Sequence, residues 1–162
     1  MSFTAIVPQD FAKILQKAAD QAFMTAINGY LDAINEDFLL TMVSWTKQAE
    51  FTIDNAHYEG GDLIGSVWTD NEIYGYVNNG TVAHDIYPVK AKRLRFMSGF
   101  QPKTYVRILG AGPGGSSPPE VFRSAVHHPG SEGRAFDEAI VTKRQPDFPD
   151  YVLSYLQNAI GG

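Results

Sequence analysis

The chain has 162 residues, 44% hydrophobic and 19% charged, a composition typical of one globular domain and not of a disordered chain. It contains no cysteine, which excludes disulfides and thiolate metal sites. The formal net charge of −5 argues against a dedicated nucleic-acid-binding protein, which usually carries a net positive charge. No apolar run approaches the roughly 18 residues that span a bilayer, and the N-terminus does not resemble a signal peptide, so we expect no membrane partner.

The first third of the chain shows helical periodicity. Apolar residues recur at three- and four-residue spacing up to Ala26, and a second register begins at Leu31. Asn28-Gly29 separates the two registers, which leaves open one long bent helix or two helices. Pro8 fits a first helical position and Asp10 the first turn. The expected apolar stripes are Phe11, Leu15, Ala18, Ala22 and Ala26, then Leu31, Ile34, Phe38, Met42, Trp45 and Ala49.

From Glu50 onward the pattern favours strands. Alternation that begins at Phe51, a Gly-Gly-Asp turn and the segment Leu63–Thr69 together predict a hairpin. A short helix is expected at 71–77, and Asn78-Asn79-Gly80-Thr81 predicts a turn. The later predicted strands are Leu94–Met97 and Tyr105–Leu109, expected to pair with each other, and Val121–Val126, ended by His128-Pro129-Gly130.

The order helix, antiparallel strands, helices predicts an α+β fold. We expect a long N-terminal helix packed on a small antiparallel β-sheet, with short C-terminal helices near Phe136–Val141 and Pro149–Ile160. The single domain, 1–162, would divide into a helical arm at 1–49, a sheet region at 50–130 with a long loop at 110–119, and C-terminal helices at 131–162.

The loop contains a literal G-x-G-x-x-G at Gly110, Gly112 and Gly115. A dinucleotide site also needs a helix N-terminus directly after these glycines, where backbone amides meet the pyrophosphate. Here two serines, two prolines and another alternating segment follow. The pattern therefore favours a surface loop, and we predict no cofactor.

The histidines raise the hypothesis of a metal site with mixed nitrogen and oxygen ligands. No pair of histidines has the i, i+4 spacing of a helical zinc motif, and adjacent residues on a strand point to opposite faces. We therefore interpret them as structural and predict no metal. A metal-dependent hydrolase or ligand-binding module stays an alternative, using His84, Asp85, His127 and His128. The further candidate ligands are His57 and Glu132.

Other polar groups do not form a catalytic constellation. No serine lies in a G-x-S-x-G elbow, and no nucleophile has a positioned base, so we predict no catalytic residue and no enzyme activity. Glu36 and Asp37 are interpreted as a solvated helix face. A basic cluster could contact DNA phosphates, but we favour a charged strand edge or an inter-subunit salt bridge. It consists of Lys90, Lys92, Arg93 and Arg95.

Short motifs between Tyr74 and Phe136 carry a resemblance to a known family. An aromatic-rich lead into a Gly-Thr pair is followed by His-x-Ile-x-Pro-x-Lys, a leucine-aromatic strand, a His-Pro-Gly turn and a phenylalanine that opens a helix. In the order of these motifs the chain resembles the gene-product-ten-like family of neck and tail-completion proteins of lambdoid siphophages. The residues that match are Gly80, Thr81, His84, Ile86, Pro88, Lys90, Leu94, Phe96, His128, Pro129, Gly130 and Phe136.

The resemblance implies a structural virion protein in the neck or tail of a tailed bacteriophage, assembled in the host cytoplasm as a closed, hexameric ring. Its partners would be other neck, connector or tail proteins, with DNA passing through without specific binding. A tail terminator or another minor tail protein is the alternative. Two segments depart from the family pattern, the loop Gly110–Pro119 and the helix after Val141. We expect a positive φ at Gly80, a bond from Thr81 to its own backbone, and Phe136 in the core.

Overall fold

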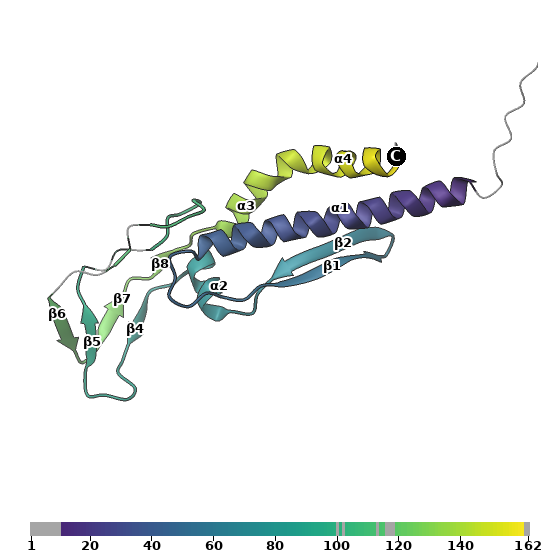
Figure 1. Ribbon diagram of the computed structural model, residues 1–162. Helices are drawn as coiled ribbons and strands as arrows, with labels where there is room; N and C mark the ends of the chain where they lie inside the picture. Colours follow the sequence, from purple (N-terminus) through teal and green to yellow (C-terminus); the bar gives the residue numbers. More distant parts are fainter. Residues whose placement is uncertain (1–10, 100, 102, 113, 116–118, 161–162) are drawn as a thin grey trace, which may run out of the picture.

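The computed structural model describes residues 11–160 except 100, 102, 113 and 116–118. The expectations for Pro8 and Asp10, and part of the loop 110–119, lie outside the described residues. The α+β prediction is confirmed: a long N-terminal helix, small antiparallel sheets and C-terminal helices make up the chain (Figure 1). No described helix combines the length and the hydropathy needed to cross a membrane.

Helix α1 is one continuous helix, Phe11–Thr41, that passes through Gly29. Gly29 serves a packing role, because a Cβ there would lie 2.6 Å from the Tyr151 hydroxyl. The prediction that the helix carries Trp45 and Ala49 is wrong. The chain leaves the helix after Thr41, whose hydroxyl donates to the Phe38 carbonyl at 2.6 Å.

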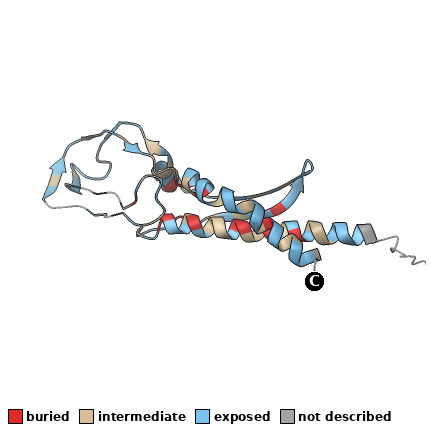
Figure 2. Ribbon diagram, turned by 90° about the horizontal axis from the view of Figure 1, so that it is seen from above, coloured by how far each residue is buried: buried red, intermediate tan, exposed pale blue. Residues whose placement is uncertain are grey.

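The hairpin of β1, Thr52–Glu59, and β2, Asp62–Trp68, lies along one side of α1, and α4, Phe148–Ile160, lies along another (Figure 1). Both elements were predicted. Gly65 allows the hairpin to approach closely, because a Cβ there would lie 2.6 Å from Leu31. Figure 2 shows that buried residues follow α1 and the elements packed on it. This part of the molecule is the body.

The remaining strands form an arm that projects from the body at the C-terminal end of α1 (Figure 1). Among the described residues the strands pair only in twos, so the single sheet expected from the sequence is replaced by separate ladders. The arm pairs are β3, Gly80–Thr81, with β8, Ser131–Glu132; β4, His84–Ile86, with β7, Val126–His128; and β5, Leu94–Met97, with β6, Glu120–Arg123.

Two strand predictions are wrong. Leu94–Met97 pairs with Glu120–Arg123 and not with Tyr105–Leu109, because the latter segment turns back on itself in a Tyr105–Ile108 bridge with Arg107 at φ +55°. The predicted strand Val121–Val126 is divided between β6 and β7, which have different partners.

Aromatic side chains form the core where the arm meets the body. Helix α2, Glu72–Asn79, contributes Tyr74, whose ring contacts Phe51 edge-to-face at 5.0 Å and Phe136 at 5.9 Å. Phe38 stacks on Phe51 at 4.7 Å. Burial raises the pKa of Tyr74 to about 12. Rings from α1, from α2 and from α3, Phe136–Arg144, thus meet in one cluster, and such pairs stabilise a core beyond their buried area.

Trp45 and Ala49 reach the same core without helical geometry. The Trp45 amide donates to the Met42 carbonyl at 2.8 Å, and the Ala49 amide donates to the Met42 sulfur at 3.2 Å. The helix-like spacing of Trp45 and Ala49 therefore arises because both residues pack in this core, and not because they lie on the helix.

The interpretation of Asp37 as a solvated residue is wrong, because its side chain is only 1% exposed. Its carboxylate accepts hydrogen bonds from Lys143 Nζ and Arg144 Nε, each at 2.6 Å. These cations come from the last turn of α3, Phe136–Arg144. Burial raises the pKa of the Asp37 carboxyl, but the bonds from Arg144 and Lys143 outweigh it and hold the pKa below its usual value. The carboxylate thus joins α1 to α3.

Candidate functional site

Four of the family-like residues, Gly80, Thr81, Gly130 and Phe136, lie where α2 ends and α3 begins. We call the segments 78–81 and 130–136 the motif junction. Gly80 has φ +80°, as predicted, and a Cβ there would lie 2.5 Å from the Ser131 carbonyl oxygen. Gly133 lies equally close to the other segment, since a Cβ there would lie 2.7 Å from the Asn78 carbonyl oxygen. The two segments therefore pack backbone against backbone, which only glycine permits.

Two expectations for this region change. The predicted turn at 78–81 is instead the end of α2 followed directly by β3, because the positive φ of Gly80 stops the helix and redirects the chain. The Thr81 hydroxyl bonds the Ser131 hydroxyl at 3.0 Å, across the β3–β8 pair, and not its own backbone. Thr81 therefore helps to hold two distant segments together.

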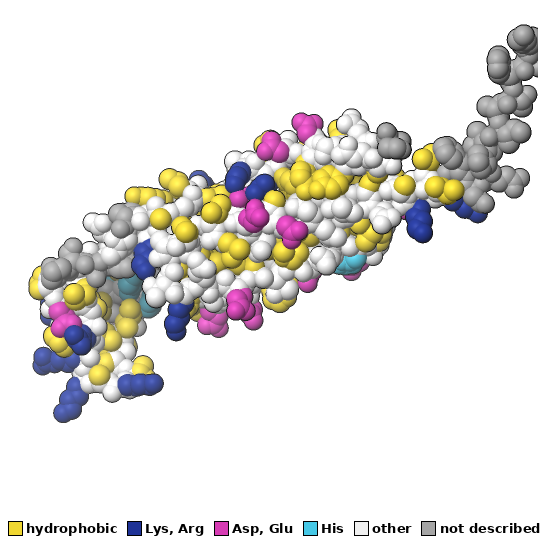
Figure 3. All heavy atoms as spheres, in the orientation of Figure 1, with side chains coloured by type: hydrophobic (Ala, Val, Ile, Leu, Met, Phe, Trp, Pro, Cys, Tyr) yellow, Lys and Arg dark blue, Asp and Glu magenta, His cyan; other side chains and the backbone are white. Residues whose placement is uncertain are grey.

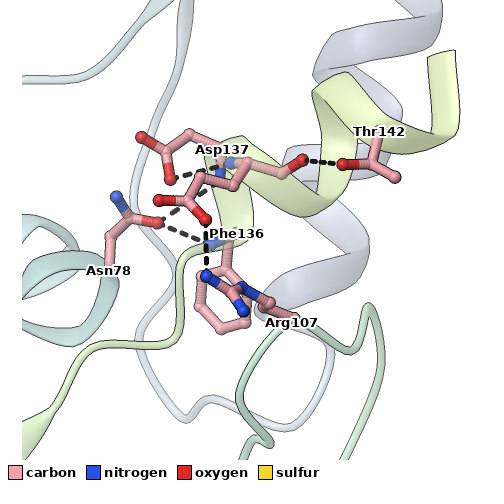
Figure 4. A network of polar contacts seen from close by, with 6 residues as sticks. Asn78, Arg107, Phe136, Asp137 and Thr142 are labelled. Atoms are coloured by element: carbon pink, nitrogen blue, oxygen red, sulfur yellow. Dashed lines mark hydrogen bonds and ion pairs between the residues drawn. The ribbon is translucent and has the colours of Figure 1, made fainter. Parts of the chain in front are cut away.

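Asn78 caps helix α3 from outside that helix (Figure 4). Its Oδ1 accepts from the Phe136 amide at 2.8 Å and from the Asp137 amide at 3.4 Å. The residue before the helix, Ala135, has φ +49° and supplies no side-chain cap. Phe136 itself is fully buried, as predicted, and Arg107 donates to Glu138 at 3.0 Å. The motif junction thereby fixes the direction of α3.

The remaining family-like residues follow the arm away from the junction. His84 and Ile86 lie on β4, and Leu94 and Phe96 lie on β5. Pro88 and Lys90 lie in the turn between these strands, and Lys90 is exposed. Gly130 has φ +91° and lies directly before β8, where its backbone packs closely against Thr81. These positions set the shape of the arm.

A groove of about 710 Å³ opens between the motif junction, the arm and the end of α1. One part of its lining is apolar and aromatic, and another part is basic. Glu132 is a carboxylate in the lining. Lys47 makes no hydrogen bond or ion pair with any described residue, and Lys103 Nζ donates to Thr46 at 3.4 Å. The lining includes Trp45, Ile73, Val77 and Ile86, the basic residues Lys47, Lys103 and Arg134, and both His84 and His128.

The pairing of β4 with β7 separates the histidine candidates into two pairs. His84 and His128 are register partners whose rings stack at 5.2 Å and line the groove. Asp85 and His127 form the adjacent register pair and bond each other at 2.7 Å. Successive strand residues face opposite ways, so the two pairs lie on opposite faces.

The other candidate ligands do not complete a metal shell. His57 lies on β1, in the body, and its Nδ1 bonds the Asn55 carbonyl at 3.0 Å. Within the described part of the chain, no three His, Asp or Glu side chains are grouped so that they could hold a metal ion. The geometry therefore does not assemble the four-residue set of the hydrolase alternative.

The basic cluster lies at the tip of the arm. Lys90, Lys92 and Arg93 are exposed and make no ion pair or hydrogen bond with the described residues. Arg95 pairs with Glu120 across β5 and β6. Figure 3 shows basic side chains at this end of the molecule.

The glycines of the G-x-G-x-x-G pattern use their backbone groups within the loop. The Gly112 amide donates to the Lys103 carbonyl, and the Gly115 carbonyl accepts from the Gln101 amide at 2.7 Å. The next described element is the strand β6. The Gly112 amide is thus engaged, and the glycines precede a strand and not the helix N-terminus that a phosphate-binding turn requires.

Comparison with protein-family models, curated proteins and solved structures found no significant match. The function must therefore be argued from the residues and their geometry. The sequence indicated individual residues of the motif junction. It did not indicate the groove, because Lys47, Lys103 and Arg134 are far apart in the chain. No local pattern marks them as neighbours.

Proposed function

We propose that the protein is a non-enzymatic structural subunit of a tailed bacteriophage, a tail-completion or neck protein that works in a closed ring, with a hexamer favoured. The observation that carries the proposal is the placement of the family-like residues, of which Gly80, Thr81, Gly130 and Phe136 meet at the motif junction while the others follow the arm. Gly80, Gly130 and Phe136 act there through backbone approach and burial. Shape-setting residues of this kind suit a scaffold, because glycine and phenylalanine carry no side-chain group that transfers a proton.

Exposed apolar side chains give independent support. Val89 and Val82 on the arm are 94% and 83% exposed, and Ile73 on α2 is 65% exposed. Isolated exposed apolar residues are ordinary, but many occur together along this arm. A subunit that buries them against neighbouring copies or other neck, connector or tail proteins explains this distribution.

The shape of the subunit supports a ring. The arm and the turn of the β1–β2 hairpin lie at opposite ends of an elongated subunit (Figure 1). Contacts between different surfaces of identical copies close into rings when the rotation closes. DNA would pass through such a ring without specific binding, in keeping with the net charge of −5. The virion neck or tail is the corresponding location.

The proposal is tested by an amber codon in place of Trp45 in the phage genome that encodes the chain. Non-suppressor cells are expected to accumulate filled heads and separate tails, with infectivity restored by a plasmid copy of the gene. Electron microscopy of the lysate reads the result. Tails of uncontrolled length would instead identify the alternative, a tail terminator, and normal infectious particles would contradict a role in the virion.

A further inference from the structure

Charge is divided unequally along the molecule. The segment 84–128, which forms most of the arm, has seven basic and two acidic residues, a net charge of +5. The rest of the chain has six basic and sixteen acidic residues, a net charge of −10. Figure 3 shows acidic side chains over the body and basic side chains toward the arm. Identical copies with such separated charges attract when unlike ends meet.

The turn of the β1–β2 hairpin is an acidic and apolar projection. Glu59 and Asp62 are exposed register partners that flank Gly60-Gly61, and neither forms an ion pair with a described residue. Both glycines have positive φ, the geometry of a tight hairpin turn, and a Cβ on either would meet nothing within 4 Å. The space beside the two glycines is therefore open among the described residues. Beside it, Tyr58 and Ile64 are 52% and 41% exposed.

The groove has the opposite character. Its basic side chains, Lys47, Lys103 and Arg134, outnumber its carboxylate, Glu132, and its floor includes apolar rings and aliphatic groups. The basic tip of the arm would be repelled by this lining, whereas an acidic segment with an aromatic residue matches it. The β1–β2 strands, Thr52–Glu59 and Asp62–Trp68, contain three acidic residues and no lysine or arginine.

A subunit cannot fill its own groove with its own hairpin turn. The Tyr58 hydroxyl donates to Asp20 on α1 at 3.4 Å, which places the turn beside the first half of the helix. The groove lies beyond Thr41, the other end of the helix. The helical rise over these residues is about 32 Å. The occupant must come from another molecule.

We infer that the hairpin turn of one copy, residues 58–64, docks in the groove of the next copy. Glu59 and Asp62 face Lys47 and Arg134, while Tyr58 contributes apolar contact. The contact is head-to-tail, so each copy offers one turn and one groove, and the interface repeats around a ring. This inference rests on the proposed ring and names the surfaces that close it.

Site-directed cross-linking tests the contact, because the natural chain has no cysteine. The variant carrying both E59C and K47C is treated with a short bismaleimide and resolved on a denaturing gel. A ladder that extends beyond the dimer is expected. Chains with only one of the two cysteines cannot extend beyond two copies. The control pair E36C and K47C, in which exposed Glu36 lies on α1, should give no ladder.

Charge reversal provides the matching test. The variants E59K/D62K and K47E/R134E should each lose at least about tenfold in self-association constant, and mixing them in equal amounts should restore assembly. Restoration also shows that both variants are folded. Absence of the ladder, or variants that assemble alone as well as the natural chain, would overturn the contact. Loss of oligonucleotide binding in K47E/R134E, without any ladder, would overturn it in favour of a nucleic-acid site.

Failure of the hairpin-to-groove contact can be distinguished from failure of the proposed ring. Rings seen by negative stain without hairpin-to-groove cross-links would overturn the contact and leave the ring in place. Cross-linked copies that remain open chains would support the contact and count against the ring.

Discussion

Replacing Asp37 with asparagine is expected to lower the free energy of unfolding by about 3 kcal/mol at neutral pH. The substitution leaves Lys143 and Arg144 without their anion, and Arg144 is only 25% exposed. Lys143 is 49% exposed and can turn to water, so the loss falls at the low end for a broken buried ion pair. Urea unfolding measures it, with Glu36→Gln, on the exposed side of α1, as the control expected to change little.

The effect of Asp37 should depend on pH in a defined direction. Burial raises the pKa of its carboxyl, but the bonds from Arg144 and Lys143 dominate and leave the folded-state pKa below the unfolded value. Its stabilisation is therefore complete above about pH 4, the ordinary pKa of aspartate, and is lost as the pH falls through the folded-state pKa. The difference between Asp37→Asn and the natural chain should shrink in acid. A difference that stays constant down to pH 2 would contradict this account.

Gly80→Ala is expected to destabilise the protein by about 3 kcal/mol or more. Its φ of +80° and ψ of 179° belong to a region that is essentially restricted to glycine and costs other residues about 1–3 kcal/mol. The added Cβ would also lie 2.5 Å from the Ser131 oxygen and 2.7 Å from the Gly133 nitrogen, both backbone atoms. Thermal or urea unfolding measures the change.

Gly75→Ala is the matched control. Gly75 lies in α2, and a Cβ there would meet nothing within 4 Å. Alanine has the better helix propensity, so this variant should be stabilised by about 0.5–1 kcal/mol. Equal effects of the two substitutions would mean that the backbone packing of the motif junction does not matter to stability.

The sequence predicted those elements whose signal is local. The register that begins at Leu31 indicated the helix, and the Gly60-Gly61-Asp62 turn indicated the hairpin. The packing role of Gly29 depends on Tyr151, more than one hundred positions away, which occupies the space beside it. Local periodicity carries no information about such a contact.

Long-range pairing could not be derived in the same way. Leu94–Met97 pairs with a segment beyond the glycine-rich loop, and several apolar segments were equally suitable partners. Asp37 has the sequence context of a solvated helix residue, and only the arrival of the last turn of α3 makes it a buried anion. Burial of charge is decided by tertiary contacts.

In the candidate site, too, some roles follow from residue type and others depend on long-range contacts. Gly80 and Phe136 could be assigned their structural roles from sequence, because a positive φ and an apolar anchor depend on residue type. The groove could not be assigned, because Lys47 lies in the segment after α1, Lys103 lies between β5 and β6, and Arg134 lies in the motif junction. The splitting of the histidines into two faces follows from the β4–β7 register, which the sequence did not specify.

The native mass of the purified protein tests the central claim most directly, by light scattering after size exclusion and negative-stain imaging of any large species. We expect a ring of about six or twelve copies of the 17.9 kDa chain with a central hole. A protein that remains a monomer at high concentration, alone and after mixing with the neck and tail proteins of the proposed phage, would overturn the proposed ring.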